Sequence, residues 1–435
     1  MRRRMPLLSL IAAILISGCL DRSIIEDGDQ VAKLEDEPRK TVVIWHTYSD
    51  EETRVFEEEV VPKFEKEYPH IRIESVRQAY NQEYQAVLLA RASAGKTPDL
   101  IRMDYTWVQQ FAHNGLLQPL EGFDGFEEVA SRLRRRMLET TLYEGNTYGL
   151  PLNITTKAAI YNNRLLKEAG LAKPPESVAE IIRVARDHHY IIGMLGLEMW
   201  QSLPYFFGLG GKFSDDGFTQ TDGYLNSPES IQAVETLVEL YHEGILNPGM
   251  LDGSADLWND VHSGRDTFMI DEGPWYYSIL LNTPSLNLNV LELTTPAPFP
   301  SNGRYRSVIG GESLVMTKGT RHKEEAWTFI RFMMRKDVQG MMFKAGLIPT
   351  NMEAFEGERT SIADNGYIGP YMQGIEEGYY LPPHPKWAVI SQIYADRLED
   401  IFVSGRDVKE ALNEASSQID AILKKEHTRR PVETP

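Results

Sequence analysis

The sequence contains a single cysteine, Cys19, among 435 residues, so an internal disulfide is excluded and packing alone must hold the fold together. It also lacks a long apolar run, since the stretch at Leu7–Ile16 is far shorter than the roughly 20 residues of a membrane-spanning helix. Positive charge is scarce: 45 Lys and Arg face 63 Asp and Glu, for a formal net charge of -18. This balance argues against binding to nucleic acid or to an anionic membrane through a basic patch.

The first residues have the parts of a secretory signal peptide. Arg2, Arg3 and Arg4 form its positive region, Leu7–Ile16 forms its apolar region, and small residues follow. We therefore expect residues 1–18 to be removed on export, which would take the formal charge from -18 to -21 because three arginines and no acids leave with them.

The motif Ile16-Ser17-Gly18-Cys19 resembles the lipobox of bacterial lipoproteins. That resemblance implies a diacylglyceryl group on the Cys19 thiol and an anchor at the outer face of a bacterial cell membrane. The alternative is an ordinary signal peptide with an incidental cysteine. Residues 19–40 are polar and acidic, so we expect a lipid-anchored flexible tether there, and residues 428–435 are expected to form a disordered tail.

Short strands and helices alternate from residue 41 onward. Strands are predicted at 41–45, 71–76 and 98–103. Helices are predicted through Val55–Phe64, over 82–94 with Gly95 as the C-terminal cap, from Tyr105, and at 229–243, 323–334, 386–402 and 407–425. This alternation predicts an α/β fold with mostly parallel sheets flanked by helices. Ligands of such sheets bind beyond the carboxyl ends of the strands, here near 45–48 and 103–105.

A series of sequence blocks follows a familiar order: Val42–His46, Tyr84–Leu89, Gly95–Leu100, Tyr148–Pro151, Ala159–Asn162, Phe268–Trp275, Gly310–Val315 and Glu325–Ile330. Their order and spacing resemble the large extracellular solute-binding family typified by maltose-binding protein. The resemblance implies a monomeric receptor of an ABC importer that closes two α/β lobes over a solute and delivers it to a membrane permease.

The resemblance also implies where the lobes lie. The N-lobe would contain residues 41–152 and 300–347, and the C-lobe residues 153–299 and 350–427. The chain would cross between them near 152–154, 294–300 and 347–350. Such crossovers suit a hinge, which absorbs its rotation in a few residues at the ends of elements.

Candidate ligand-binding residues follow from the same comparison. Trp275 matches the family tryptophan that stacks on a sugar ring, and Asp104 follows the third strand, where the family places a carboxylate. A core tryptophan and a helix N-cap are the respective structural alternatives. The further candidates are His46, Tyr48, Gln82, Tyr161, Trp200, Gln201, Glu272, Tyr276, Gly311 and Glu312. Gly310 and Gly311 are expected to let a ligand approach the backbone.

The aromatic and polar character of these residues predicts a carbohydrate ligand, and the number of aromatics favours an oligosaccharide. Asp104, Glu272 and the acidic composition leave an organic cation or polyamine as the alternative ligand. A secreted glycoside hydrolase is the alternative function, although the strand–helix units of a barrel hydrolase are missing. No cofactor, metal, catalytic residue or nucleic-acid partner is expected.

Overall fold

The computed structural model describes residues 39–79, 83–263, 265–283, 289–301, 303–361 and 366–427. The chain divides into two units, Met1–Arg39 and Lys40–Pro435, and the second holds all the elements described below. The predicted signal peptide, Cys19, most of the predicted tether, Gln82 and the tail at 428–435 lie outside the described residues.

The larger sheet has seven strands. They are β1 (Lys40–His46), β2 (Ile71–Arg77), β3 (Leu100–Asp104), β6 (Leu150–Thr156), β11 (Val308–Met316), β12 (Ile348–Pro349) and β13 (Tyr379–Tyr380). The order is β12-β6-β11-β3-β1-β2, and β13 pairs with β11. Strands β2 and β3 run parallel to β1, whereas β11 runs antiparallel to both β3 and β6.

The smaller sheet has four strands in the order β10-β7-β9-β8. They are β7 (Ala158–Asn162), β8 (Ile191–Gly193), β9 (Thr267–Glu272) and β10 (Thr294–Pro298), and β8 and β9 form the only parallel pair in this sheet as described. A separate hairpin joins β4 (Leu142–Tyr143) to β5 (Asn146–Thr147).

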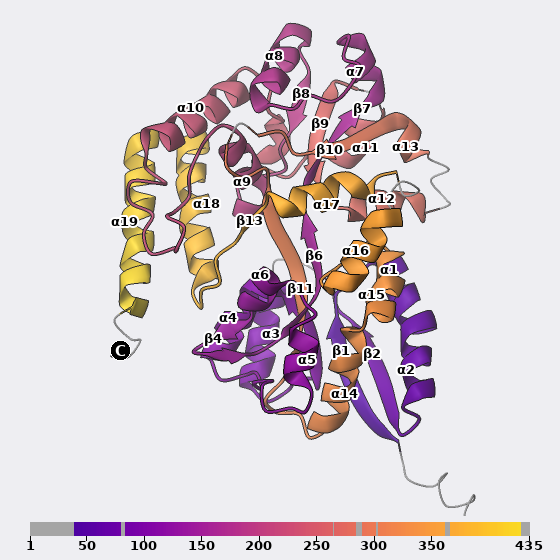
Figure 1. The fold of residues 1–435 in the computed structure, drawn as a ribbon. Helices are drawn as coiled ribbons and strands as arrows, with labels where there is room; N and C mark the ends of the chain where they lie inside the picture. Colours follow the sequence, from indigo (N-terminus) through magenta and orange to yellow (C-terminus); the bar gives the residue numbers. More distant parts are fainter. Residues whose placement is uncertain are drawn as a thin grey trace, which may run out of the picture. The chain divides into compact units, whose positions relative to one another are not determined.

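The α/β class is confirmed, but the prediction of mostly parallel sheets was wrong, because both sheets are mixed. The reason lies in the connections between the sheets (Figure 1). Strand β6 leaves the larger sheet for β7, and β11 returns to it from β10, so these two neighbours must run in opposite directions.

The long helices predicted from the sequence are all present in the structure. Their bounds are α1 (Asp50–Val55), the π-helical turn η1 (Phe56–Val60), α2 (Val61–Glu67), α3 (Tyr84–Ser93), α4 (Tyr105–His113), α5 (Phe126–Ala130), α6 (Arg135–Glu139), α7 (Asn163–Glu168), α8 (Val178–His188), α9 (Met199–Gly208), α10 (Pro228–His242), the 3-10 turn η2 (Pro248–Met250), α11 (Leu257–Ser263), α12 (Trp275–Leu281), α13 (Val290–Leu293), α14 (Lys323–Met333), α15 (Lys336–Phe343), α16 (Met352–Ser361), α17 (Ile368–Glu376), α18 (Trp387–Ser404) and α19 (Val408–His427). Gly95, predicted to cap α3, has a φ of 67°, which suits glycine.

Helices cover both faces of the larger sheet with separate cores. On one face Ile44 and Leu314 pack with Phe56, Phe64 and Phe329 from η1, α2 and α14. The other face carries Ile101, Met103 and Val315, which pack against α3 and α4. A third and larger core surrounds the smaller sheet and includes α8 to α11, α18 and α19. Each sheet therefore has its own core, and the core of the smaller sheet extends to Ile154, Ile309 and Ile348 of the larger sheet near the crossings.

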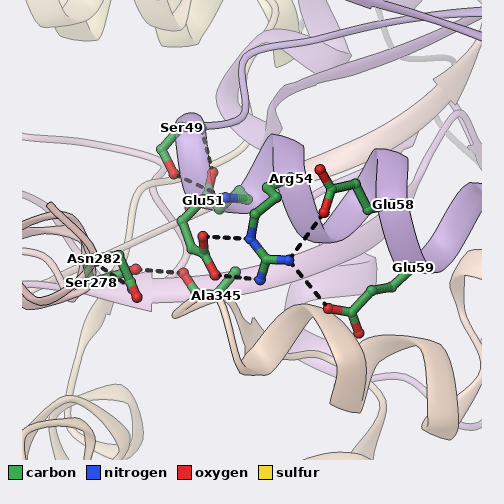
Figure 2. Close-up of polar contacts among 9 residues, drawn as sticks. Ser49, Glu51, Arg54, Glu58, Glu59, Ser278, Asn282 and Ala345 are labelled. Carbon is green, nitrogen blue, oxygen red and sulfur yellow. Dashed lines mark hydrogen bonds and ion pairs between the residues drawn. The ribbon is translucent and has the colours of Figure 1, made fainter. Parts of the chain in front are cut away.

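The chain passes between the two sheets at the ends of β6, β10 and β12. It leaves β6 for β7 through a single residue, Lys157, slightly beyond the crossover predicted at 152–154. It returns between β10 and β11, over residues 299–307, and leaves again after β12. Near these crossings α1 lies in contact with α12, and Ser278 Oγ of α12 donates a hydrogen bond of 2.7 Å to the carbonyl oxygen of Ala345, which follows α15 (Figure 2).

The start of α1 is fixed by a capping box, also visible in Figure 2. The Ser49 backbone N–H donates to Glu52 Oε2 at 2.8 Å, and Ser49 Oγ accepts from the Glu52 N–H at 3.4 Å. One turn later Arg54 pairs with Glu51 at 2.8 Å and lies near Glu58 and Glu59. The cap defines where the loop after β1 ends, whereas the exposed ion pairs add little stability.

Candidate functional site

Two tryptophans form an aromatic surface beside the crossovers. Trp200 stands at the start of α9 and Trp275 at the start of α12, and both are half-buried. Their ring centroids are 6.3 Å apart, and the ring planes are inclined by 30°. Trp275 folds back over Gly273, where a Cβ atom would lie 2.2 Å from the indole ring. The local sequence Gly273-Pro274-Trp275 thus lets the ring lie flat against its own backbone.

Glu272 supports this surface from the end of β9. Its Oε1 accepts a hydrogen bond of 3.1 Å from Trp258 Nε1, and its Oε2 accepts one of 2.9 Å from the Gly273 backbone N–H. Glu272 is buried, and no ion pair with it occurs in the part of the chain that the structure describes. These two N–H groups satisfy the buried carboxylate at the residue that precedes Gly273-Pro274-Trp275.

Two carboxylates face each other where the end of β3 lies beside the middle of β11. Asp104 and Glu312 are directly opposite residues of the antiparallel ladder, so their side chains lie on the same face of the sheet. Asp104 Oδ1 accepts from the backbone N–H of Thr106 at 2.8 Å and from its Oγ1 at 2.6 Å, which makes Asp104 the N-cap of α4. Burial raises the pKa of Asp104 to about 6, and the charge on Glu312 acts in the same direction.

Arg102 compensates Glu312 from within the sheet. The two side chains are joined by an ion pair of 2.9 Å, and Glu312 also accepts a 2.6 Å hydrogen bond from Asn153 Nδ2. The guanidinium donates to Thr47 Oγ1 at 2.9 Å and lies over the Tyr48 ring at 4.5 Å from its centroid. Arg102 is 3% exposed and Glu312 is 22% exposed, so a solute could reach the carboxylate but not the cation.

The aromatic surface and the carboxylates meet along β11. Gly310 lies against the Trp200 ring, and Glu312 follows two residues later on the same side of the strand. The prediction that Gly310 and Gly311 admit a ligand is therefore corrected, because protein atoms fill that space. A Cβ on Gly311 would lie 2.3 Å from the Asn153 carbonyl oxygen, and the φ of Gly311 is 141°.

Four predicted contact residues lie in the core instead of at an accessible surface. His46, Tyr48, Tyr161 and Tyr276 are each 0–1% exposed. His46 Nδ1 accepts from the Tyr48 backbone N–H and Nε2 lies 2.8 Å from Ser75 Oγ, while burial lowers the pKa of His46 to about 3 and keeps the ring neutral. None of these four side chains presents surface to a solute in this structure, so their contacts with a ligand stay a prediction.

The sequence already contained the signal for His46 and Tyr48. Val42, Ile44, His46 and Tyr48 alternate with more exposed residues, so all four share the buried side of β1 and of the loop after it. Tyr161 lies in β7, in which every residue is buried. Tyr276 packs edge-on against Trp258 at 5.2 Å between centroids.

Sequence reasoning missed Lys157, Arg102 and Trp258. Each of the two cations interrupts a run of uncharged residues, Ile154-Thr155-Thr156-Lys157-Ala158 and Leu100-Ile101-Arg102-Met103. A lysine or arginine in a buried strand requires an acidic partner, so the two strands with internal acids, at Asp271 and Glu312, could have been searched for it. Trp258 carries no comparable signal.

The arrangement suits a neutral molecule with flat C–H faces and several hydroxyl groups. Two inclined indole rings offer stacking surfaces, and Asp104, Glu272 and Glu312 offer acceptors. Among residues 39–427, apart from the undescribed gaps, no three His, Cys, Asp or Glu side chains gather as metal ligands. None of the helices in the same ranges has the length and apolar character needed to traverse a bilayer.

Comparison with known families identifies this arrangement. The model of a family described as bacterial extracellular solute-binding protein matches residues 59–365. The chain belongs to that family. This extracellular solute-binding protein is accordingly a receptor and not an enzyme, as predicted.

Relatives of this solute-binding protein share about a quarter of its residues. A binding protein of Brucella abortus is 25% identical over 85% of this chain and 90% of its own. The maltotriose-binding protein of Pyrococcus abyssi is 24% identical over 88% and 80%, respectively. The maltooligosaccharide ABC transporter solute-binding lipoprotein of Streptococcus pneumoniae is 24% identical over 76% and 78%.

Solved structures confirm the two-lobed fold of this family member. The GacH receptor of Streptomyces glaucescens, solved without ligand and with acarbose, matches with a TM-score of 0.75 at 24% identity, over 89% of this chain and 99% of that chain. The sugar-binding protein MalE of Xanthomonas citri matches with a TM-score of 0.73 at 23% identity, over 90% and 100%. At these identities the likeness establishes the fold and leaves the ligand to be determined.

Proposed function

We propose that this protein is the receptor of an ABC importer for an oligosaccharide. The sugar would bind between the N-lobe and the C-lobe, close them by bridging both, and be released to the membrane permease. The observation that carries the proposal is the half-buried pair Trp200 and Trp275. The Trp200 ring lies against Gly310, two residues before Glu312, and Glu312 lies opposite Asp104 in the sheet. Stacked rings and acceptor groups together are the usual means of binding a polyhydroxylated ring.

The relatives support this class of ligand. Their names specify maltotriose, maltooligosaccharides, arabinooligosaccharides and galactooligosaccharides, all of which are neutral sugars of more than one unit. A ligand that contacts both lobes binds only the closed arrangement, so its affinity sets how far the equilibrium moves toward closure.

We further propose that Cys19 carries the lipid anchor and holds the receptor at the outer face of the cell membrane. The lipobox-like motif Ile16-Ser17-Gly18-Cys19 supports this, and the Streptococcus pneumoniae relative is named a lipoprotein. An acyl anchor would keep the receptor near its permease after the signal peptide is removed.

The test is a thermal-shift screen against malto-, arabino- and galactooligosaccharides, followed by calorimetry of the ligands that raise the unfolding midpoint. Trp275→Ala should reduce the affinity for the selected sugar by tenfold or more, a loss of about 1.4 kcal/mol. The matched control is Tyr241→Ala, which removes a half-buried aromatic ring on α10 that packs against Phe402. Unchanged affinity in Trp275→Ala would mean that the ligand binds elsewhere.

An organic cation remains the second candidate, because Asp104 and Glu272 form no ion pair with any residue that the structure describes. A polyamine such as spermidine belongs in the same screen. Binding of spermidine in place of every sugar would replace the carbohydrate proposal and keep the receptor.

A further inference from the structure

Lys157 lies at the crossover between the two sheets. Strand β6 ends at Thr156 and β7 begins at Ala158, so Lys157 is the only residue between them. Its side chain is completely buried. A buried ammonium requires compensation, and the groups that compensate it show what this crossover residue holds in place.

The ammonium group contacts two elements that carry the aromatic surface. It forms an ion pair with Asp271 of β9, and it donates to Gln201 Oε1 at 2.6 Å and to the Trp200 carbonyl oxygen at 3.4 Å. Asp271 Oδ1 in turn accepts a 2.7 Å hydrogen bond from Tyr205 Oη, one helical turn after Gln201. Lys157 thus connects the start of α9 with the strand that leads to Glu272 and Trp275.

Helix α9 rests on the crossovers at further points. The Trp200 ring lies against Gly310 of β11. The Tyr205 ring packs edge-on against Phe299, with centroids 5.1 Å apart, and Gly208 lies so close to the Pro300 carbonyl oxygen that a Cβ would be 3.2 Å from it. Phe299 and Pro300 belong to the return crossover between β10 and β11. The helix that presents Trp200 is therefore seated on two of the crossings.

The contact with Lys157 also determines which way the Gln201 amide faces. An ammonium group donates hydrogen bonds and accepts none, so only the oxygen of the amide can point toward it. The amide nitrogen must then point away from Nζ, with its two N–H donors available on the half-buried side chain. Asp104, Glu272 and Glu312 supply acceptors to the surrounding site, and Gln201 adds donors.

Stability alone does not account for such a buried ion pair. Replacing buried charged pairs with apolar or neutral residues of similar size is often neutral or stabilising, because the desolvation penalty of the charges disappears. Neutral residues at positions 157 and 271 would not fix the orientation of the Gln201 amide.

We propose that Lys157 is a positioning residue for the ligand site, which holds Trp200 against the crossover and orients Gln201 so that its amide donates hydrogen bonds to the solute. This inference rests on the proposed function, since it assigns Gln201 a hydroxyl-bearing ligand. A solute with hydroxyl or carbonyl oxygens at that position would be preferred over one with a donor only.

The test removes both charges of the Lys157–Asp271 pair, first in the otherwise unmodified protein and then in a Gln201→Ala variant. Lys157→Met alone should lower the unfolding midpoint, because it leaves Asp271 buried without a cation. Lys157→Met/Asp271→Asn should recover most of that midpoint and still leave an acceptor for Tyr205. Its affinity for the best-binding member of the oligosaccharide panel should nevertheless be about tenfold lower than that of the unmodified protein.

The same pair of substitutions is then made together with Gln201→Ala. If Lys157 acts through Gln201, the neutral pair should cause no further loss of affinity in this background. Arg164→Met, which removes an exposed ion pair with Glu168 on α7, is the matched control and should change neither affinity nor midpoint.

Two results would overturn the proposal while leaving the receptor function intact. One is an unchanged sugar affinity in Lys157→Met/Asp271→Asn. The other is that these two substitutions lower the sugar affinity equally whether residue 201 is Gln or Ala. Should that double variant fail to fold, Gln201→Glu answers the question, because it keeps an oxygen for Lys157 and removes the donors. Its affinity should fall with the midpoint maintained, and an unchanged affinity would refute the proposal. An unmodified protein that binds no sugar would refute the proposed function and this inference with it.

Discussion

The Trp200 indole ring of α9 lies in contact with the backbone of Gly310, a residue of β11 in the larger sheet. A Cβ atom at Gly310 would lie 2.8 Å from Cη2 and 2.9 Å from Cζ3 of the ring, closer than any stable contact allows. The absence of a side chain at Gly310 therefore permits the position of the ring, and with it the 6.3 Å separation from Trp275. The geometry of the aromatic surface depends on a strand of the opposite lobe.

Gly310→Ala should accordingly displace the Trp200 ring. We expect a loss of sugar affinity of about tenfold, with a fall in stability of about 1–3 kcal/mol from overpacking. Calorimetry and urea unfolding measure the two effects. Gly122→Ala is the matched control, because a Cβ there has no atom within 4 Å and its φ is not positive. Full affinity in Gly310→Ala would show that the ring can move without consequence for the ligand.

The affinity for a sugar should depend on pH through Asp104. Burial raises the pKa of this carboxyl to about 6, so it becomes neutral as the pH falls below that value and accepts hydrogen bonds from ligand hydroxyls less strongly. Calorimetry between about pH 7.5 and pH 5 should show that the affinity for the sugar decreases as the pH is lowered. Asp104→Asn should bind more weakly at neutral pH and show no such decline.

The same raised pKa has a consequence for folding with the opposite sign. The folded protein holds the Asp104 proton more tightly than the unfolded chain does, so the contribution of Asp104 to stability decreases as the pH rises from 3.8 to about 6. Burial also raises the pKa of Asp271 to about 6, so the Asp104→Asn comparison is needed to separate the two carboxyls. An identical pH dependence in Asp104→Asn and the unmodified protein would assign the effect to another group.

Arg102 should contribute strongly to stability. Arg102→Met leaves Glu312 without its cation in the middle of β11 and removes the guanidinium from the Tyr48 ring. We expect a loss of about 3 kcal/mol, near the lower end of the range for breaking a buried pair because Glu312 retains partial access to water. Arg132→Met, which breaks an exposed pair with Glu128, should change stability by less than about 1 kcal/mol. Equal effects of the two substitutions in urea unfolding would contradict this interpretation.

Cys19 should determine whether the receptor stays with the membrane. In a bacterial host, Cys19→Ser should shift the protein from the membrane fraction to the soluble exported fraction, because no other thiol can accept the acyl groups. The purified variant should bind sugar as the unmodified protein does. Retention of Cys19→Ser in membranes after salt washing would exclude the lipid anchor.

Local patterns predicted the elements well. The strand at 41–45, the helix ending at Gly95 and the long C-terminal helices all appear within a few residues of their predicted bounds. The direction of strand pairing did not follow from those patterns, because it depends on β6 and β11 crossing between the sheets in opposite senses. That relation involves segments about a third of the chain apart.

The sequence predicted the location of some candidate site residues and not of others. Trp200, Trp275, Asp104, Glu272 and Glu312 gather near the crossovers, whereas His46, Tyr48, Tyr161 and Tyr276 are buried behind them. Residue type indicates what a side chain can bind, but its accessibility depends on which face of a strand or helix the rest of the fold covers.

The sequence by itself determined the order of strands and helices and membership of a solute-binding family, because both follow from local composition or from motifs in a fixed order. Only the tertiary structure decided that Lys157 meets Asp271 and Gln201, that Arg102 meets Glu312, and that Gly310 receives the Trp200 ring. Each of these contacts joins residues distant in the chain. Burial and close approach depend on how the cores of the two sheets pack around the crossovers.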